Sequence, residues 1–385
     1  MHKAKNTESP KPGWRRVKFG DVVRKCNEKV DPETSGLERY IAGDHMDTND
    51  LRLRRWGEIG SGYLGPAFNI RFKPGQVLYG SRRTYLRKVA VADFEGICAN
   101  TTLVLEPNNA QALMPEFLPF LMQSEEFTEY SIKNSKGSVN PFINFSDLAE
   151  FEFHLPPASE QMRISRLLAA FDTAIDGYRE LIASLDQARN TMLLSDLGKG
   201  WVKQKISDVA QVVTGKTPPT GTPVYWEGDV PFATPGDLAF DNGKLSHTTR
   251  TISEAGADCS RVVPPGSTLV VCIGSTIGKV AQTTNRTAFN QQINAVVCKE
   301  IVDDYMYAIS TTIGAELSKR AGTTAVPIIN KGEFEKILIP VPPIETQIEI
   351  SKRFFCFVEN KTDVLDRLSH LRRLKAEAAN FVLAR

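Results

Sequence analysis

The segment Leu155-Pro156-Pro157-Ala158-Ser159-Glu160-Gln161 begins a long stretch in which apolar residues recur at alternating steps of four and three. The recurring residues are Ile164, Leu168, Phe171, Ile175, Tyr178, Ile182 and Leu185. This heptad spacing is typical of a helix that pairs with another helix along a narrow apolar seam. The proline pair with Ser159 and Glu160 indicates a helix start, and Gly198 indicates its end. We therefore predict one long helix over residues 156–197.

The same pattern occurs again near the C-terminus. The segment Val341-Pro342-Pro343-Ile344-Glu345-Thr346-Gln347 repeats the helix start 186 positions later (341 − 155), and Lys361 stands where the first copy has Ile175. The second seam consists of Ile350, Phe354, Phe357, Val364, Leu368 and Leu371. Two long helices with matching seams, over 156–197 and 341–385, most simply pack on each other. The alternative is two separate surface helices on two different domains.

The segments that precede the two helices are also related. Gly13-Trp14 corresponds to Gly200-Trp201, and Lys88-Val89-Ala90 corresponds to Lys279-Val280-Ala281, in the same order along the chain. A period this long indicates duplicated domains and not a solenoid. We predict a loose tail over 1–12, a first globule over 13–155 before its helix, and a second globule over 198–340 before the other helix.

Within each globule the pattern predicts a mixed α/β (α+β) domain. Short apolar runs that are rich in β-branched residues predict strands, and they lie at 77–79, 88–91, 103–105, 268–272 and 295–298. Residues 115–130 and 303–319 are expected to be helical.

The composition is that of an ordinary globular protein. The 385 residues are 41% hydrophobic and 24% charged, enough for two or three domains that each bury a core. The formal net charge is only +2, so any contact with nucleic acid has to come from local patches. The six cysteines form no Cys-x-x-Cys pair, and no apolar run approaches the length of about 20 residues that a membrane span needs. We expect a cytoplasmic protein with reduced thiols and no membrane association.

Fragments that look catalytic lack their necessary context. Gly215-Lys216-Thr217 is similar to part of a phosphate-binding loop, but Pro218 and Pro219 prevent the helix that such a loop requires. The five histidines show no metal-ligand spacing. We therefore predict no catalytic residue and no metal site, and we keep a nucleotide-dependent enzyme only as a rival hypothesis.

Basic residues are concentrated in the first globule. Between Arg52 and Lys88 there are nine Lys or Arg residues and one acid, Glu58, interleaved with aromatic residues. This mixture on turns suits contact with phosphates and with base edges. The residues that we predict to contact DNA are Arg54, Arg55, Arg82, Arg83, Tyr85, Arg87 and Lys88. We expect Arg82, Arg83, Arg87 and Lys88 to share a turn between two short strands. The alternative is a solvated charged face.

The matching region of the second globule is less basic and richer in Thr, Asn and Gln. Hydroxyl and amide side chains can also read bases, and Asn or Gln pairs well with adenine. The candidate DNA contacts are Lys216, Thr217, Thr276, Lys279, Asn290 and Gln291. Asn290 and Gln291 stand where the first globule has Ala99 and Asn100. Alternatively, these polar residues pack the end of a strand, and the sequence favours neither interpretation.

The ordered pair of copies resembles the specificity subunits of type I restriction–modification systems, and the resemblance covers the whole chain except the tail. It rests on the Leu-Pro-Pro-x-x-Glu-Gln helix start, on Thr214-Gly215-Lys216-Thr217-Pro218, on Phe289-Asn290-Gln291-Gln292, and in the first copy on residues 78–90. The resemblance implies that each globule is a target recognition domain that reads one half of a split double-stranded DNA site. Because the first copy lacks the Thr-Gly-Lys-Thr-Pro and Asn-Gln-Gln segments, the two half-sites are expected to differ.

The resemblance also implies an assembly. The two helices would form an antiparallel coiled coil that sets the spacer and docks two methyltransferase subunits, which motor–nuclease subunits then join. The chain itself would be non-catalytic, and S-adenosylmethionine, ATP and Mg would belong to the partner subunits. The rival hypothesis is a coiled-coil adaptor that binds proteins and does not recognise DNA.

Overall fold

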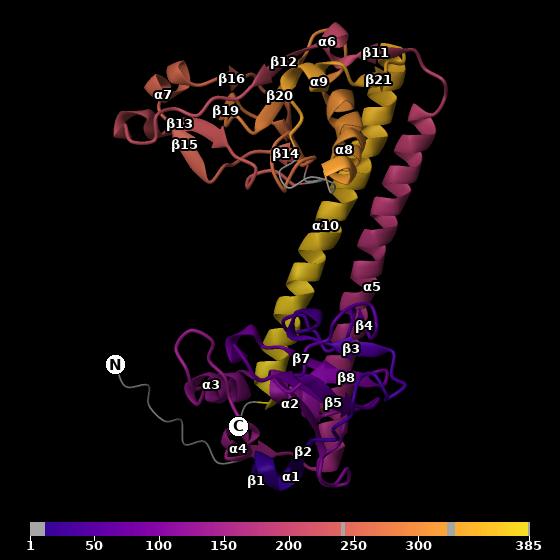
Figure 1. Ribbon diagram of the computed structural model, residues 1–385, viewed down its shortest axis with the longest axis vertical. Helices are drawn as coiled ribbons and strands as arrows, with labels where there is room; N and C mark the ends of the chain where they lie inside the picture. The colour runs from indigo at the N-terminus through magenta and orange to yellow at the C-terminus, as the bar shows by residue number, and fades with distance from the viewer. Residues whose placement is uncertain (1–11, 240–242, 322–327, 384–385) are drawn as a thin grey trace. The chain divides into compact units, whose positions relative to one another are not determined.

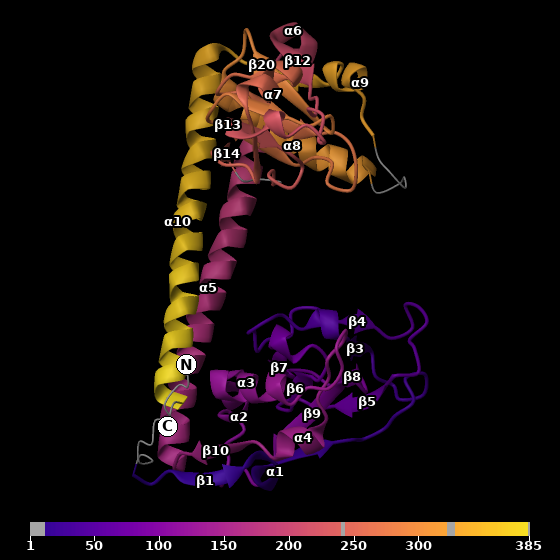
Figure 2. The same cartoon turned by 90° about the vertical axis from the view of Figure 1, so that its left-hand side faces the viewer.

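The computed structural model describes residues 12–239, 243–321 and 328–383 of the chain (Figures 1 and 2). The tail predicted over 1–12 therefore lies almost entirely outside the described residues. The chain divides into two compact units, of which one comprises residues 1–177 with 368–385 and the other comprises 178–367. Each unit contains one globule and a part of both long helices.

The globule of the first unit contains two four-stranded sheets. One has the strand order β2 (Val23–Cys26), β9 (Thr102–Pro107), β6 (Val77–Gly80) and β7 (Val89–Val91). The other has the order β4 (Gly57–Glu58), β3 (Arg39–Ile41), β8 (Gly96–Ala99) and β5 (Phe68–Phe72). Ile41, Phe72, Leu78 and Val104 form a buried core from strands of both sheets. A separate ribbon pairs β1 (Arg15–Lys18) with β10 (Glu152–Leu155) and so joins the two ends of the globule.

The second globule repeats this topology strand for strand and adds one strand. Its larger sheet has the order β12 (Ala210–Thr214), β20 (Ile293–Cys298), β17 (Thr268–Val271), β18 (Val280–Thr283) and the additional β14 (Lys244–Leu245). Its other sheet has the order β15 (Arg250–Ile252), β13 (Trp226–Ala233), β19 (Thr287–Phe289) and β16 (Val262–Val263). The closing ribbon pairs β11 (Lys203–Lys205) with β21 (Leu338–Pro340). The predicted duplication and the mixed α/β fold are thus confirmed.

Helices cover the sheets of both globules. They are α1 (Phe19–Val22), α2 (Leu118–Gln123), α3 (Glu125–Lys133) and α4 (Phe145–Ala149) in the first globule, and α6 (Ile206–Val209), α7 (Glu254–Cys259), α8 (Asp303–Ala321) and α9 (Lys331–Glu335) in the second. Helices α1 and α4 match α6 and α9, the pair α2 and α3 stands where the second globule has α8, and α7 has no counterpart in the fully described stretch between β4 and β5. The prediction of one helix over 115–130 is wrong in one respect, because the helix is interrupted at Ser124. Ser124 adopts an extended conformation, and its hydroxyl accepts a hydrogen bond from Phe127 N at 3.2 Å, which caps a new helix.

The long helices begin with the same buried clamp. They are α5 (Ala158–Leu197) and α10 (Ile344–Leu383). The side-chain amide of Gln161 donates to Pro156 O at 2.9 Å and its oxygen accepts from Met114 N at 2.8 Å. Gln347 makes the same two contacts in the second copy, to Pro342 O at 2.8 Å and from Val302 N at 2.9 Å. Both glutamines are 1% exposed. The glutamine of the repeated Pro-Pro entry therefore fastens each globule to the start of its own helix.

The predicted seam residues face inward. None of the thirteen, all within the described part of the chain, is exposed. The first two residues of each seam also belong to a globule core: Ile164 and Leu168 lie in the first core with Val382 of α10, while Ile350 and Phe354 lie in the second core with Leu193 of α5. The seam therefore contributes to the globule cores as well as to helix pairing.

Ion pairs show that the helices are antiparallel within the second unit. Lys361 Nζ lies 2.9 Å from both carboxylate oxygens of Asp186, and Arg353 pairs with Asp196, so residue numbers fall on α10 as they rise on α5. In the first unit Lys375 Nζ lies 2.5 Å from Asp172 Oδ1. The carboxylate is on α5 and the cation on α10 in all three pairs. Lys361, the polar interruption of the second seam, thus has an ion-pair partner on the facing helix. A polar seam residue with such a partner can specify the register in which the two helices pack.

Candidate nucleic-acid interface

Four segments meet at one end of the larger sheet in the second globule, where β12 and β17 finish and β18 and β20 begin. We call this end the second loop cluster, and it consists of residues 214–217, 234–239, 273–279 and 289–292. Backbone hydrogen bonds hold the segments together: Lys216 N donates to Phe289 O at 2.9 Å, and Asn290 N donates to Ala233 O at 3.1 Å. A Cβ atom on Gly215 would collide with the backbone of Asn290. Glycine is therefore required there for the two segments to touch.

The polar side chains of this cluster bond to one another. Thr217 Oγ1 donates to Gln291 Oε1 at 2.7 Å, and Asn290 Nδ2 donates to Gln292 Oε1 at 3.0 Å. Lys216 and Gln291 are exposed, while Thr217, Thr276 and Asn290 are half-buried. An ammonium group and an amide are thus presented from a preorganised surface. Such groups can hold a phosphate and read a base edge.

The first globule has the equivalent cluster at the same end of its sheet, which we call the first loop cluster (residues 42–50, 81–88, 99–101 and 140–142). The predicted turn between two strands is confirmed, since residues 81–88 connect β6 to the antiparallel β7. The turn is held at several points. Ser81 N donates to Thr101 O at 3.0 Å, and Arg83 N donates to Pro141 O at 2.6 Å.

Two arginines in this turn have left-handed backbone conformations, Arg83 with φ of 50° and Arg87 with φ of 51°. Non-glycine residues pay about 1–2 kcal/mol for this conformation, so surrounding contacts must enforce it. The guanidinium of Arg87 donates to Asn49, to Glu125 at 2.5 Å and to the backbone of Gln123 at 2.7 Å. Arg87 therefore braces the turn.

Lys88 and Lys279, the last residues of the two turns, make the same contact in both copies. Lys279 Nζ donates to Pro235 O at 3.2 Å, and Lys88 Nζ donates to Gly43 O. The two carbonyls occupy equivalent positions. Ile41 pairs in parallel with Cys98, and Ala233 pairs in parallel with Phe289. Gly43 follows Ile41 by two residues, and Pro235 follows Ala233 by two residues. Both lysines therefore link two segments of their loop clusters.

Most cations of the basic window already have acidic partners. Of the nine Lys and Arg residues between 52 and 88, all within the described part of the chain, six lie in ion pairs with carboxylates. The pairs are Arg52 and Arg54 with Asp176, Arg54 with Asp50, Arg55 with Asp47, Arg71 with Glu28 and Glu95, Lys73 with Glu28, and Arg87 with Glu125. None of these acids lies inside the window, so a count along the sequence could not find them. Arg82, Arg83 and Tyr85 stay exposed on the turn.

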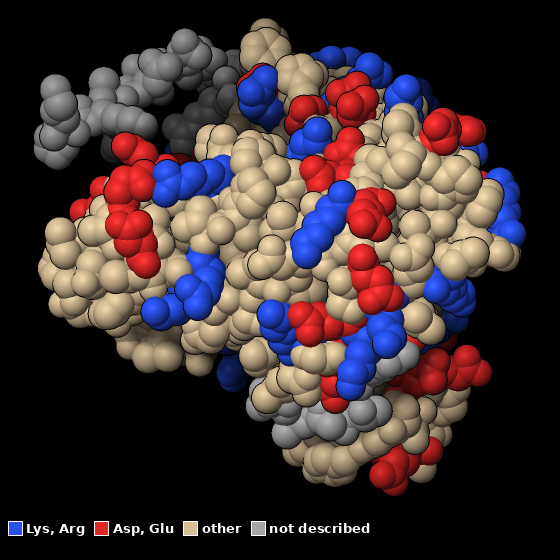
Figure 3. All heavy atoms as spheres, turned by 90° about the horizontal axis from the view of Figure 1, so that it is seen from above, with Lys and Arg blue, Asp and Glu red and all other residues tan. Residues whose placement is uncertain are grey.

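Charges of both signs are also interspersed elsewhere on the surface. On the face drawn in Figure 3, Lys and Arg side chains lie next to Asp and Glu side chains. Within the described residues, no three His, Cys, Asp or Glu side chains come together in a way that could hold a metal ion. The described helices include none that is long and apolar enough to cross a membrane.

The predicted DNA contact of this turn is tested by Arg82→Ala combined with Arg83→Ala, which should weaken DNA binding by the full chain. We expect about a tenfold loss and a salt slope smaller by about 1 for each arginine that holds a phosphate. Arg71→Ala is the control, since Arg71 is held by two glutamates and should leave the slope unchanged. Salt-titrated binding measures both quantities. Unchanged affinity of the double variant at physiological salt would place the turn on a solvated face.

Comparison with known proteins gives the class of this chain. The model of the type I restriction modification DNA specificity domain matches residues 12–187 and again residues 198–369. These two matches include most of the chain, which therefore belongs to the type I restriction–modification DNA specificity family. The two matched copies agree with the two globules and their helices.

Relatives of similar sequence are specificity subunits of type I restriction enzymes. The specificity subunit of the type I restriction enzyme HindI from Haemophilus influenzae is 24% identical over 423 aligned residues, which cover 86% of this chain and 90% of that subunit. The specificity subunit of MjaIX from Methanocaldococcus jannaschii is 30% identical over 189 residues, or 46% of this chain and 44% of that one. This second match therefore spans less than half of the relative.

Solved structures show the same fold. A chain in a structure that addresses complex assembly and conformational transition of the type I R–M system matches with a TM-score of 0.59 at 20% identity, and covers 98% of this chain and 99% of its own length. The S subunit of a type I system from M. genitalium matches with a TM-score of 0.57 at 15% identity, over 100% and 98% of the two chains.

Proposed function

We propose that this chain is the non-catalytic, DNA-reading subunit of a type I restriction–modification complex, in which each loop cluster reads one half of a split double-stranded DNA site. The observation that carries the proposal is the recurrence of one architecture: the same end of the same sheet bears converging loops in both globules. Exposed cationic and polar groups lie on both clusters, Arg82 and Arg83 on the first and Lys216 and Gln291 on the second.

The two clusters should read different sequences. The first offers guanidinium groups and Tyr85, which suit guanine edges, phosphates and stacking. The second offers an amide, a hydroxyl and an ammonium, and amides pair well with adenine. Since the side chains at equivalent positions differ in kind, identical half-sites are not expected.

The helices supply the second part of the proposal. A continuous helix of 40 residues has a length of roughly 60 Å at about 1.5 Å per residue, which exceeds one turn of DNA of about 34–36 Å. We infer that α5 and α10 set the number of unread base pairs between the half-sites. Their solvent-facing sides would dock two methyltransferase subunits, which motor–nuclease subunits join. S-adenosylmethionine, ATP and Mg would then act in those partners.

Mapping of methylated adenines tests the proposal. The chain is expressed with an adenine methyltransferase subunit from its own operon in cells that lack other methylation, and methylated positions are located across the genome. We expect one bipartite sequence with a fixed spacer, and binding of the purified complex that weakens steeply with salt. A protein-binding adaptor would give no sequence-specific methylation and no salt-dependent DNA binding.

A further inference from the structure

A cluster of four charged residues attaches the first globule to α5, and we call it the Asp176 cluster (Asp50, Arg52, Arg54 and Asp176). Arg52 Nε lies 2.7 Å from Asp176 Oδ2, and Arg54 pairs with the other oxygen, Asp176 Oδ1. Arg54 Nε also lies 2.8 Å from Asp50 Oδ2. The Arg54 guanidinium therefore bridges a carboxylate of the globule and a carboxylate of the helix.

The carboxylates of this cluster are shielded from water. The side chains of Asp176 and Asp50 are 11% and 8% exposed, and that of Arg54 is 33% exposed. A planar guanidinium that bonds two carboxylates fixes their geometry more tightly than a single ammonium could. Removal of one member of such a partly buried cluster leaves the remaining charged groups without one of their hydrogen-bond partners. The cluster therefore constrains the orientation of the first globule on α5.

The second globule has a different arrangement at the equivalent place. Strand pairing makes Arg52 equivalent to Lys244, because Arg52 pairs with Val91 in the way that Lys244 pairs with Gln282. The offset of 186 residues between the helices makes Asp176 equivalent to Thr362. Thr362 Oγ1 donates to Val358 O of its own helix at 2.9 Å. The carboxylate that receives two arginines in the first copy is thus replaced by a hydroxyl directed back to α10.

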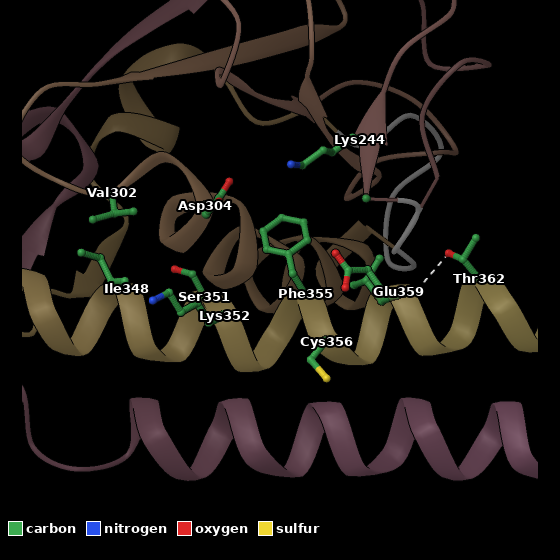
Figure 4. A pocket seen from close by; sticks show the side chains of 12 residues that line it. Lys244, Val302, Asp304, Ile348, Ser351, Lys352, Phe355, Cys356, Glu359 and Thr362 are labelled. Carbon is green, nitrogen blue, oxygen red and sulfur yellow. Dashed lines mark hydrogen bonds between the residues drawn. The ribbon is translucent and has the colours of Figure 1, made fainter.

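Figure 4 shows what occupies this place in the second unit. Lys244 and Thr362 both line a cavity of about 660 Å³ between the globule and α10, with Asp304, Phe355 and Glu359. Lys244 Nζ lies 5.2 Å from the centre of the Phe355 ring. A cation over a ring is a weaker and less directional contact than a bridged ion pair.

We propose that Asp176, Arg52 and Arg54 are positioning residues that fix the angle of the first recognition domain on the helices, and thereby the spacer that the complex accepts. The inference rests on the proposed function. Each base pair added to the spacer moves a half-site by about 3.4 Å and rotates it around the DNA axis. A first domain held at one angle selects one spacer, whereas a loosened domain can follow a half-site that is displaced by one base pair.

The same contacts give Arg54 a role that differs from the DNA contact predicted from the sequence. A phosphate contact would act through the arginine alone, and its loss would reduce the salt slope by about 1. A positioning role acts through the pair, so Asp176→Asn and Arg54→Gln should have the same effect. Neither variant should then change the salt slope.

The test uses the full chain in its methyltransferase complex. For Asp176→Asn and Arg54→Gln we expect methylation at spacers one base pair shorter or longer to rise about tenfold relative to the wild-type spacer. Lys244→Gln and Thr362→Val, at the positions of the second unit that are equivalent to Arg52 and Asp176, are the controls and should keep the wild-type spacer distribution. Unchanged selectivity in both test variants, or a uniform loss of methylation without relaxation of the spacer, would overturn the proposal.

Amide exchange on the isolated chain provides a second readout that needs no DNA. Arg52 N donates to Asp50 Oδ1 at 3.1 Å, so this amide should exchange faster in Asp176→Asn while the core strands β6 and β9 stay protected. Unchanged exchange at residues 51–54 would show that the cluster does not hold the segment. Absence of any sequence-specific methylation by the wild-type complex would instead refute the proposed function. The amide-exchange result could still be interpreted in that case, because it needs no DNA.

Discussion

Insertion of seven residues into each long helix should move methylation to sites whose unread spacer is longer by about three base pairs. Seven helical residues add roughly 10 Å at about 1.5 Å per residue, and one base pair occupies about 3.4 Å. Both half-sites should keep their sequences, because neither loop cluster is altered. This is the largest effect that we expect, since methylation at the original spacing should disappear.

The structure indicates where to insert. Insertion after Gly177 and after Arg367, where the chain passes between its two compact units, leaves each unit intact. It preserves the ion pairs of Lys375 with Asp172 and of Lys361 with Asp186. It also leaves the Asp176 cluster on the side of the first globule. A whole heptad keeps the apolar seam in phase on both helices.

Two comparisons make the result decisive. An insertion in α5 alone is the control, because it prevents the ion pairs of both units from forming together and should abolish assembly. Mapping of methylated adenines in cells that carry the double insertion reads the new spacing directly. If methylation continues at the original spacing, the helices dock partners but do not set the spacer.

Asp237→Ala should reduce the stability of the second globule by about 2–4 kcal/mol at neutral pH. The two carboxylate oxygens of Asp237 accept four hydrogen bonds: from Thr249 N and Oγ1 at 2.7 Å each, and from Thr234 N and Oγ1 at 2.8 and 2.7 Å. The substitution leaves two backbone donors without this partner and frees the segment 234–239 of the second loop cluster from Thr249. Urea unfolding measures the loss, and Asp229→Ala, which removes an exposed carboxylate of β13, is the control.

The effect should depend on pH in a defined direction. Burial alone raises the pKa of Asp237, but the hydrogen bonds from Thr249 and Thr234 outweigh it and hold the pKa below its ordinary value. A carboxyl whose pKa is lower in the folded chain stabilises the fold above its unfolded pKa of about 3.9, and this contribution is lost as pH falls through the folded pKa. The difference between wild type and Asp237→Ala should therefore be full at pH 7 and shrink below about pH 4. A constant difference down to pH 2 would contradict this assignment.

The helices and their seams were predictable from the sequence because heptad spacing is a local property. The pairing of Lys361 with Asp186 was not, since the two residues are 175 positions apart and only the facing register brings them together. The role of Gln161 was also hidden. The sequence shows that a glutamine recurs at both helix starts, but its partner, Met114 N, lies in a loop of the preceding globule.

The loop clusters were only partly predictable. The turn between β6 and β7 follows from two short apolar runs, and the second loop cluster contains the segments that the resemblance singled out. The count of basic residues between Arg52 and Lys88 was misleading as a measure of free charge. Asp176, for example, neutralises Arg54 from 122 positions away, so the excess of positive charge in the window is largely balanced in space.

An exchange of the second globule tests the central claim most directly. Residues 200–340 are replaced by the matching domain of another member of the family whose methylated site is known, so that the ribbon of β11 and β21 closes the graft at both ends. Methylated adenines are then mapped for the hybrid in complex with its methyltransferase subunit. We predict that one half-site changes to that of the donor while the other half-site and the spacer stay as in the wild type. A change in both half-sites, or in neither, would contradict the account of two independent readers on one pair of helices.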